Sequence, residues 1–362
     1  MKKSLIALAA LAASGAAMAQ SSVTLFGVAD ATFAYGTGTV SKKTQLGNSG
    51  LNGSRLGFRG VEDLGGGLSA AFHLEAGLAP DDGTGGTTDT NNQGNAVSGG
   101  LLFNRRSTLS LNGGFGEVRL GRDYTPHFLN LTSFDPFGTS GVGTTQTLKS
   151  SIGGPTNVRA SNSIGYLLPG NLGGFYGQGQ FYMGENSSDM VNKKDGNGVS
   201  LRAGYANGPI DVAGSFAKTT YLLNTANAAK GMPTGNITTM NFGGKYDLGV
   251  VKILGQYAQD KVIGYGTGKG LLGGVQIPVG PAGEVRLSFS TYKVNKIGLN
   301  TPNPATNKIA AGYVHNLSKR TAVYGTFANV TNKKGATQAL NGSVTAPNKK
   351  SSGFDFGIRH SF

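Results

Sequence analysis

The chain has 362 residues, 61 of them glycine, 18 phenylalanine and 13 tyrosine, and only 38 % of its residues are hydrophobic. This composition suits β-strands in which every second residue is apolar. The absence of cysteine excludes disulfide bonds and thiolate metal sites. No nucleic-acid-binding motif accompanies the formal charge of +14, so the charge favours anionic solutes or anionic lipid head groups over nucleic acid as partners.

The N-terminus has the three parts of a secretory signal. Lys2 and Lys3 precede an apolar run over 5–13, and Ala17-Met18-Ala19 forms a small-residue cleavage site. We therefore expect residues 1–19 to be a signal peptide and residues 20–362 to form one mature domain. After this segment no apolar run approaches the ~20 residues that a spanning helix requires, so a membrane location would require a closed β-barrel.

Alternating runs of about ten residues recur along the mature chain, joined in turn by very short and by long polar connections. The short connections lie at 63–67, 112–114, 169–171, 207–209, 247–249, 280–283 and 316–318. The long ones lie at approximately 37–50, 79–100, 123–156, 185–197, 222–236, 261–269, 296–306 and 333–351. Seven short turns between eight long loops predict an all-β fold, a sixteen-stranded antiparallel transmembrane β-barrel. The turns would face the periplasm and the loops the outside, around an aqueous lumen.

The alternation assigns a face to each side chain, because one face of every strand must meet lipid and the other water. Over 68–76 the apolar residues occupy the even positions and face lipid. The ionisable side chains that this rule places in the lumen, here and in 199–205 and 284–290, are His73, Glu75, Arg202, Glu284 and Arg286. Charge is costly in lipid and cheap in water, so this assignment is energetically forced.

Three arginines and one glutamate lie at a similar height in this scheme. Arg55, Arg106 and Arg159 come seven to ten positions before a short turn, and Glu75 comes eight positions after one. At ~3.3 Å per residue and a tilt near ~45°, these positions lie roughly 16 to 23 Å above the turns. We expect an arginine ladder with one acidic partner. Guanidinium groups in a narrow water channel attract anions and repel cations.

Each of these arginines has an alternative role. It could be a salt-bridged residue of the wall, or it could bind lipopolysaccharide from outside. Arg105 is the ambiguous position, because strict alternation turns it outward beside Arg106, whereas a β-bulge would exchange the two. Both arginines are therefore candidates for the lumen.

The third long loop, 123–156, is the longest and carries several aromatic residues, among them Tyr124, Phe134 and Phe137. Such a loop is poorly suited to lie free in water, so we expect it to fold into the lumen and narrow the channel. Asp135 would then present a carboxylate opposite the arginines. The alternatives are an ordinary exposed loop and a contact with a neighbouring subunit.

The last ten residues, 353–362, alternate strictly and end on an aromatic residue. Phe354, Phe356, Ile358 and Phe362 share one face of this strand. A last strand that cannot remain an open edge must pair, and apolar outside with polar inside is the pattern of a barrel in lipid.

Two other classes of function fit the sequence less well. An enzyme embedded in a barrel would need a positioned nucleophile and base. The histidines do not supply them, because His360 faces lipid, His315 lies beside a periplasmic turn, and His73 is explained as a polar residue of the lumen. A plugged structural barrel would need a plug or an additional periplasmic module. We therefore expect no enzyme activity, no catalytic or metal site and no cofactor.

Several segments together resemble the general porins of beta-proteobacteria, most closely the anion-selective Comamonas/Delftia type, and the resemblance extends from Gln20 to Phe362. They are SSVTLFG at 21–27, SRLGFRGVEDLG at 54–65, RRSTLSL at 105–111, FGEVRLGR at 115–122, GYVHNLSKRT at 312–321 and GIRHSF at 357–362. The loops depart from the family pattern, particularly at 79–100 and 222–236.

This resemblance implies a homotrimer of sixteen-stranded barrels, each with its own pore and with the third loop folded into the lumen. It also implies an arginine cluster at the constriction, matched by Arg55, Arg159 and one of Arg105 and Arg106, with Glu75 as the acidic wall residue. We expect a porin of the cell outer membrane that allows passive diffusion of small hydrophilic solutes and ions, preferring small anionic solutes. The expected partners include outer-membrane lipid and lipopolysaccharide.

Overall fold

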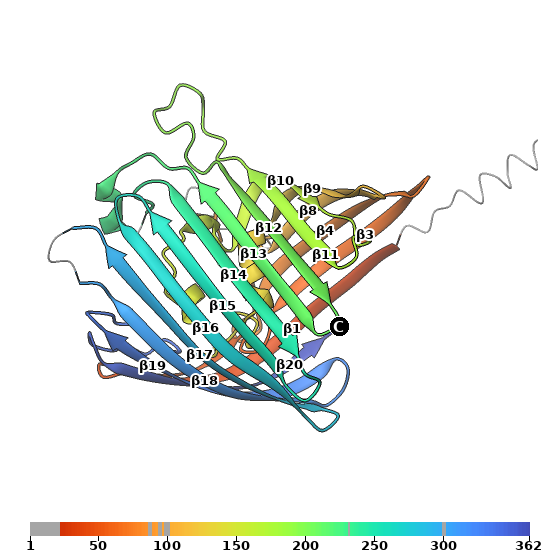
Figure 1. Ribbon diagram of the computed structural model, residues 1–362. Helices are drawn as coiled ribbons and strands as arrows, with labels where there is room; N and C mark the ends of the chain where they lie inside the picture. Colours follow the sequence, from red (N-terminus) through yellow and green to blue (C-terminus); the bar gives the residue numbers. More distant parts are fainter. Residues whose placement is uncertain (1–21, 86–88, 93–95, 98–101, 231, 299–301) are drawn as a thin grey trace, which may run out of the picture.

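The computed structural model describes residues 22–85, 89–92, 96–97, 102–230, 232–298 and 302–362, and the expected signal peptide lies outside these residues. The described chain forms a closed antiparallel barrel of sixteen strands (Figure 1). The first strand, β1 (Ser22–Thr37), pairs with the last, β20 (Lys350–Ser361), and this pairing closes the barrel.

The other fourteen strands of the barrel follow one another around the wall, each paired with its neighbours. They are β3 (Arg55–Gly65), β4 (Leu68–Ala79), β8 (Arg106–Gly113), β9 (Gly116–Tyr124), β10 (Arg159–Leu167), β11 (Phe175–Tyr182), β12 (Gly198–Asn207), β13 (Ile210–Thr219), β14 (Ile237–Asp247), β15 (Lys252–Val262), β16 (Gly266–Val279), β17 (Gly283–Lys296), β18 (Ala305–Asn316) and β19 (Thr321–Lys333).

Smaller elements lie in the loops. They are the strands β2 (Lys42–Asn48), β5 (Thr84–Gly85), β6 (Asp89–Thr90) and β7 (Ala96–Val97), the helices α2 (Pro126–Ser133) and α3 (Gln146–Lys149), and the 3-10 turns η1 (Pro155–Asn157) and η2 (Thr225–Lys230). Within the described ranges, no helix is long and apolar enough to cross a membrane.

The outer face of the barrel is apolar, as the alternation predicts. On β20, Phe354, Phe356 and Ile358 are exposed, whereas Asp355 and Gly357 are buried. Such a continuous exposed apolar surface is suited to contact with lipid.

The strand pairing continues to the last residue of the chain. The backbone N–H of Phe362 donates to the carbonyl of Gly27 over 3.1 Å, and the N–H of Gly27 donates to the carbonyl of Phe362 over 3.0 Å. The Phe362 ring occupies the space beside Gly27 where a side chain would stand. Glycine at this position therefore lets the terminal aromatic residue pack on the first strand.

Short turns join neighbouring strands at all seven predicted positions, whereas two of the predicted loops are wrong in extent. Residues 42–48, expected in the first loop, form β2, which pairs with the upper half of β1 from Lys42 opposite Thr37 to Asn48 opposite Ala31. The loop expected over 261–269 spans only 263–265, because β15 continues to Val262 and β16 begins at Gly266. These strand ends are polar in sequence, so composition alone could not distinguish them from loop residues.

The third long loop folds into the lumen, where its helices are visible between the walls of the barrel (Figure 1). The helix α2 begins with Pro126 in its first turn, and the side chain of Thr125 accepts a hydrogen bond from the N–H of Phe128 as its N-cap. Thr145 caps α3 in the same way. Capping satisfies backbone donors that this loop would otherwise leave unpaired next to the wall.

The loop packs closely on the inner wall because glycines leave room for its large side chains. A Cβ at Gly243 on β14 would lie 2.3 Å from the ring of Phe134, and one at Gly274 on β16 would lie 2.5 Å from Pro136. Glycine is therefore required at both positions for the loop to approach the strands.

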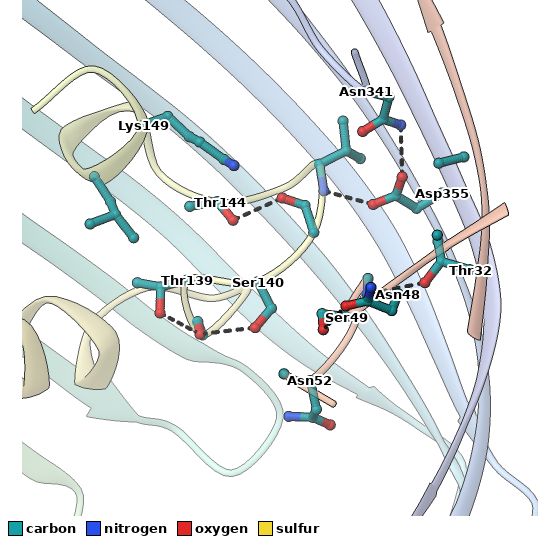
Figure 2. Close-up of a pocket in the computed structure, with 18 of the residues that line it drawn as sticks. Thr32, Asn48, Ser49, Asn52, Thr139, Ser140, Thr144, Lys149, Asn341 and Asp355 are labelled. Atoms are coloured by element: carbon teal, nitrogen blue, oxygen red, sulfur yellow. Dashed lines mark hydrogen bonds between the residues drawn. The ribbon is translucent and has the colours of Figure 1, made fainter. Parts of the chain in front are cut away.

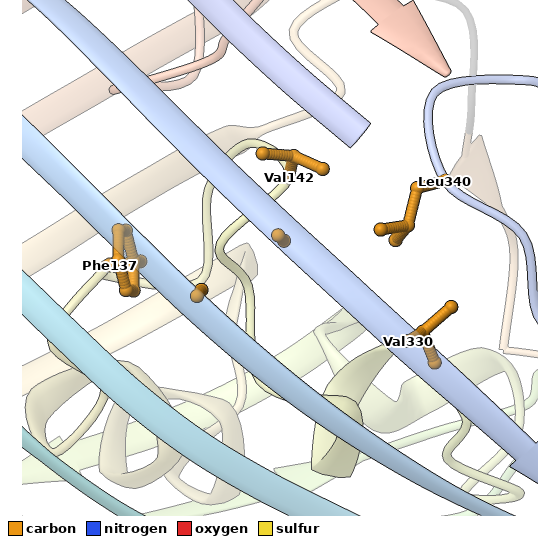
Figure 3. Packing of buried hydrophobic residues seen from close by; sticks show 6 residues of the cluster. Phe137, Val142, Val330 and Leu340 are labelled. Atoms are coloured by element: carbon orange, nitrogen blue, oxygen red, sulfur yellow. The ribbon is translucent and has the colours of Figure 1, made fainter. Parts of the chain in front are cut away.

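Further along the loop, an apolar cluster joins it to β18 and β19 (Figure 3). Phe137 and Val142 of the loop pack with Val330 on β19 and with Leu340 of the loop that follows β19. The third loop is thus held along the wall from β14 to β19.

Candidate functional site

The lumen contains a cavity of about 910 Å³ beside the third loop. Figure 2 shows Thr139, Ser140 and Lys149 of the third loop on one side of this space, and Asn48 and Asn52 on the other. The charged side chains that line the cavity are Arg55, Arg105, Lys149, Arg159, Asp81 and Asp355. This cavity is the water-accessible space in which a passing solute would meet the protein.

Two of the arginines share one carboxylate. The Nε of Arg105 lies 2.6 Å from Oε1 of Glu75, and the Nε of Arg55 lies 3.8 Å from Oε2 of the same residue. His73 Nε2 lies 3.5 Å from Oε2 on the side of Glu75 that faces the periplasm. Glu75 itself is 7 % exposed, so it holds the arginines in place and contributes little surface to the cavity.

The third arginine of the cavity is held by uncharged groups. Arg159 lies over the ring of Tyr124, with Cζ 4.3 Å from the ring centroid. Its Nε donates to the backbone carbonyl of Arg105 over 2.9 Å, and its NH2 donates to the Tyr124 hydroxyl over 2.8 Å. Arg105 donates to the same hydroxyl over 2.7 Å. Tyr124 therefore links two cations without neutralising either.

The balance of charge in this cluster is positive. Three guanidinium groups, which remain protonated at any physiological pH, are accompanied by one carboxylate, Glu75. Lys149 adds a fourth cation from α3, across the cavity. Two further carboxylates line the cavity, and their neutral partners do not cancel a negative charge: Asp81 accepts from Asn48 over 3.0 Å, and Asp355 accepts from the N–H of Val142 over 2.7 Å. Together with Glu75 they leave the four cations with an excess of one positive charge.

Arg106 also lies on the lumen side, on β8 directly opposite Glu75, but it does not line this cavity. Its Nε lies 3.5 Å from Oδ2 of Asp123 and 3.3 Å from the hydroxyl of Thr108. Arg119 joins the same group, 2.6 Å from Asp123 and 2.7 Å from Glu117. Here two arginines meet two carboxylates, so this second network is close to neutral. Of the predicted arginines, Arg55 and Arg159 line the cavity, whereas Arg106 belongs to this second network.

The outward orientation that strict alternation gave Arg105 is wrong. The strand β8 begins only at Arg106, and Arg105 lies in a bend before it, where alternation does not apply. Its backbone N–H donates to the carbonyl of Glu75 over 3.0 Å, which turns the side chain toward the lumen. Both arginines of the pair therefore face inward, and neither displaces the other.

The expectation for Asp135 is also wrong, because its carboxylate does not face the arginines. It is 3 % exposed and accepts hydrogen bonds from the backbone N–H groups of Phe137, Thr139 and Thr145, within its own loop. Burial raises its pKa, against the lowering effect of these bonds. Asp135 organises the turn of the third loop and does not line the passage.

A second inturned segment narrows the cavity, and no pattern in the sequence pointed to it. Between β2 and β3 the chain turns into the lumen at residues 49–54. The buried carboxylate of Asp30 on β1 accepts the N–H groups of Leu51 and Asn52 over 2.8 and 2.6 Å. The Tyr324 hydroxyl also donates to this carboxylate. The segment therefore has a fixed position directly before Arg55.

The helix α2 is held against the wall by hydrogen bonds from residues that the sequence analysis did not identify. The Nδ2 of Asn241 on β14 donates to Nδ1 of His127 over 2.9 Å, and Asn130 donates to the carbonyl of Ala213 over 3.2 Å. Arg202, which alternation placed in the lumen, donates to Asn130 over 2.9 Å. Burial lowers the pKa of His127 to about 4, so the imidazole is neutral at pH 7.

Comparison with known proteins agrees with this architecture. The family model for Gram-negative porins matches residues 5–335. The chain is 39 % identical to outer membrane porin protein 32 of Delftia acidovorans, and the alignment covers all of both chains. It is 29 % identical to an outer membrane porin protein of Bordetella pertussis, again over both full lengths.

A solved structure extends the likeness to three dimensions. The anion-selective porin from Comamonas acidovorans superposes with a TM-score of 0.81 at 34 % identity, covering 95 % of this chain and all of that one. The chain therefore belongs to the Gram-negative porins, outer-membrane β-barrels that act as passive channels and not as enzymes.

Proposed function

We propose that this porin prefers anions among the small hydrophilic solutes that it passes, and that Arg55, Arg105 and Arg159 form its filter. The observation that carries the proposal is the presence of these three guanidinium groups around one cavity, where with Lys149 they outnumber the carboxylates Glu75, Asp81 and Asp355. The similar porin from Comamonas acidovorans is described as anion-selective, which supports the same assignment here.

The expected size of the effect follows from Coulomb's law. A unit charge at roughly 8 Å in water changes the energy of a monovalent ion by ~0.5 kcal/mol, or about twofold in local concentration. Low-dielectric walls raise this figure. One uncompensated charge therefore favours anions over cations about fourfold, because it raises the local concentration of one ion and lowers that of the other.

Arg106 has a different role in this proposal. Its charge is matched by Asp123, so we assign it to the wall beside the filter, where it supports selectivity less than Arg55, Arg105 and Arg159 do. For Arg106 this assignment corresponds to the alternative given in the sequence analysis, in which an arginine is a salt-bridged residue of the wall.

The test is the permeability ratio of chloride to potassium for Arg55→Gln, Arg105→Gln and Arg159→Gln, reconstituted in planar bilayers. Each variant removes one cation from the cavity, and we expect the ratio to fall about fourfold in each. The paired double variant Glu284→Gln/Arg286→Gln is the control, because it removes charge from the lumen face of β17 without changing the net charge. A ratio that stays at the wild-type value in all three single variants would refute the filter.

Two further properties that the resemblance implies are proposed on the same basis. We propose that the mature chain begins at Gln20, which N-terminal sequencing of the exported protein tests. We also propose that three copies form the functional unit, each with its own pore. Native mass spectrometry of the purified protein tests this assembly: a trimer is expected, and a monomer at all concentrations would contradict it.

A further inference from the structure

The cavity has an apolar surface beside the filter. Tyr124, Phe128, Leu129 and Val158 line the cavity, and they come from the end of β9, from α2 and from the position directly before β10. Backbone hydrogen bonds fix these segments to one another. The N–H of Thr125 donates to the carbonyl of Val158 over 3.0 Å, and the N–H of Leu129 donates to the carbonyl of Thr125 over 3.1 Å. We call the four lining residues the apolar patch.

The apolar patch lies in direct contact with the cations of the filter. The rings of Tyr124 and Phe128 stack, with their centroids 5.1 Å apart and an angle of 18° between their planes. The guanidinium of Arg159 lies over the same Tyr124 ring, and Val158 is its neighbour in the chain. A solute whose charged group lies at Arg159 therefore places any attached apolar group beside the patch.

The third loop does not need this patch to stay on the wall. Leu131, Phe134 and Phe137 of the loop are buried, and Phe134 and Phe137 pack on wall strands. Leu129 and Val158, in contrast, are partly exposed in the cavity. An ion filter acts through charge and gains nothing from apolar side chains, whereas binding sites for organic solutes combine an apolar lining with a few placed polar groups.

The arginines retain donors for a carboxylate. Arg55 has 28 % of its side chain exposed, and its ion pair among the described residues is the 3.8 Å contact with Glu75. Arg159 uses Nε and NH2 for neutral oxygens, and its NH1 group has no hydrogen-bond partner in the described part of the chain. A guanidinium group can donate two parallel hydrogen bonds to a carboxylate, which makes this pair both strong and directional.

We propose that the filter favours amphiphilic monocarboxylates, solutes in which one carboxylate is attached to an aromatic or branched apolar group. The carboxylate lies against Arg55 and Arg159, and the apolar group covers the apolar patch. The inference rests on the proposed anion filter and adds an apolar half to it. Binding of this kind raises the concentration of the solute in the passage without any chemical change.

Other anions would use only part of this surface. Chloride pairs with guanidinium groups and has no apolar group to place on the patch. A dicarboxylate such as succinate would use a second cation, and Lys149 extends into the same space from α3 (Figure 2). Its binding would depend on Lys149 and not on Leu129 and Val158.

The test compares benzoate and formate as blockers of the chloride current through the wild-type protein in planar bilayers. Both carry one carboxylate, and only benzoate has a ring. We expect benzoate to halve the current at about tenfold lower concentration, since covering roughly 60 Å² of apolar surface corresponds to about this factor in affinity. Benzamide has the ring without the charge and is expected to block about tenfold more weakly than benzoate.

The double variant Leu129→Gln/Val158→Thr makes the patch polar without changing any charge. We expect it to lower the ratio of the half-blocking concentrations of formate and benzoate about fivefold, because the ring loses most of its apolar contact. Val158→Thr alone, which nearly keeps the shape of the side chain, is the second variant and should lower the ratio in the same direction if the double variant does not form channels.

Leu148→Gln is the matched control. It makes the same change in the same loop and the same cavity, but Leu148 lies on α3, which packs on β16, β17 and β18, whereas α2 packs on β11 to β14. The control is expected to keep the wild-type ratio.

Three results would overturn the inference. Benzoate and formate could block equally, the control could lower the ratio as much as the patch variants do, or succinate could block at lower concentration than benzoate. A pore that prefers chloride to potassium but treats benzoate and formate alike would refute the apolar half and leave the filter intact. A pore without anion preference would refute the filter itself, so the two proposals can fail separately.

Discussion

The guanidinium of Arg159 lies over the ring of Tyr124 and donates to its hydroxyl, so the cation is held in the lumen without a carboxylate. A carboxylate would hold the side chain as firmly but would cancel its charge. An aromatic ring with a hydroxyl fixes the arginine and leaves the charge available to a passing ion. In this part of the site, Tyr124 fixes the position of Arg159 without neutralising its charge.

Replacing Tyr124 by Phe tests this separation. The variant retains the ring under Arg159 but removes the hydroxyl that accepts hydrogen bonds from Arg105 and Arg159. We expect the anion preference to remain, because no charge is lost, while single-channel current becomes noisier as the two arginines gain rotamers. A loss of anion preference as large as that of Arg159→Gln would show that the hydroxyl itself is needed for selectivity.

Glu75→Gln should change selectivity in the opposite direction to the arginine variants. It removes the only carboxylate that Arg55 and Arg105 share, so the cavity gains one uncompensated positive charge. The chloride-to-potassium permeability ratio is expected to rise about fourfold. The same carboxylate also positions Arg105, so thermal unfolding of the variant is the companion measurement. An unchanged or lower ratio in a folded barrel would argue against the assigned role of Glu75.

Much of this architecture could be predicted from the sequence, because a two-residue alternation is forced wherever one strand face meets lipid. The number of strands, the seven turns and the inward direction of Arg202 follow from it. The rule fails where the strand ends: Arg105 lies in the bend before β8, and its direction depends on a hydrogen bond to Glu75.

Loop residues were the other point at which the sequence was insufficient. Asp135 was expected to present its carboxylate to the lumen, but three backbone N–H groups of its own loop donate hydrogen bonds to that carboxylate. Tyr124 was visible as an aromatic residue of the third loop, whereas its position under Arg159 depends on the pairing of β9 with β10. Both outcomes depend on contacts between segments that alternation does not address.

Gly243→Ala tests how the third loop is held. The added Cβ would lie 2.3 Å from Phe134, so the loop must move or the strand must shift, at a cost of about 1 to 3 kcal/mol. We expect a folded barrel with altered single-channel conductance and more frequent current fluctuations. Gly214→Ala on the adjacent strand is the control, because its Cβ would meet no atom closer than 3.8 Å. Equal effects of the two variants would contradict the packing described here.

The docking of α2 against the wall should weaken at low pH, because His127 on this helix is buried in its neutral form. Its pKa of about 4 in the folded protein lies below the ordinary value near 6.5, so the undocked loop binds a proton more readily than the docked one. The stabilisation is complete above pH 6.5 and is lost as pH falls from 6.5 to 4, by about 3 kcal/mol.

The readout is the frequency of current fluctuations at pH 7 and pH 4.5. Wild-type channels should fluctuate more at pH 4.5, and His127→Gln, which cannot gain a charge, should show a smaller difference between the two pH values. Acid-induced fluctuations of the same size in both proteins would assign the effect to other groups.

The most direct test of the central claim is the zero-current potential of the purified wild-type protein in a planar bilayer under a KCl gradient. A positive cavity predicts that chloride is more permeant than potassium, so the potential should take the sign set by chloride diffusion. A potential of zero, or one of the sign set by potassium, would contradict an anion filter built from Arg55, Arg105 and Arg159.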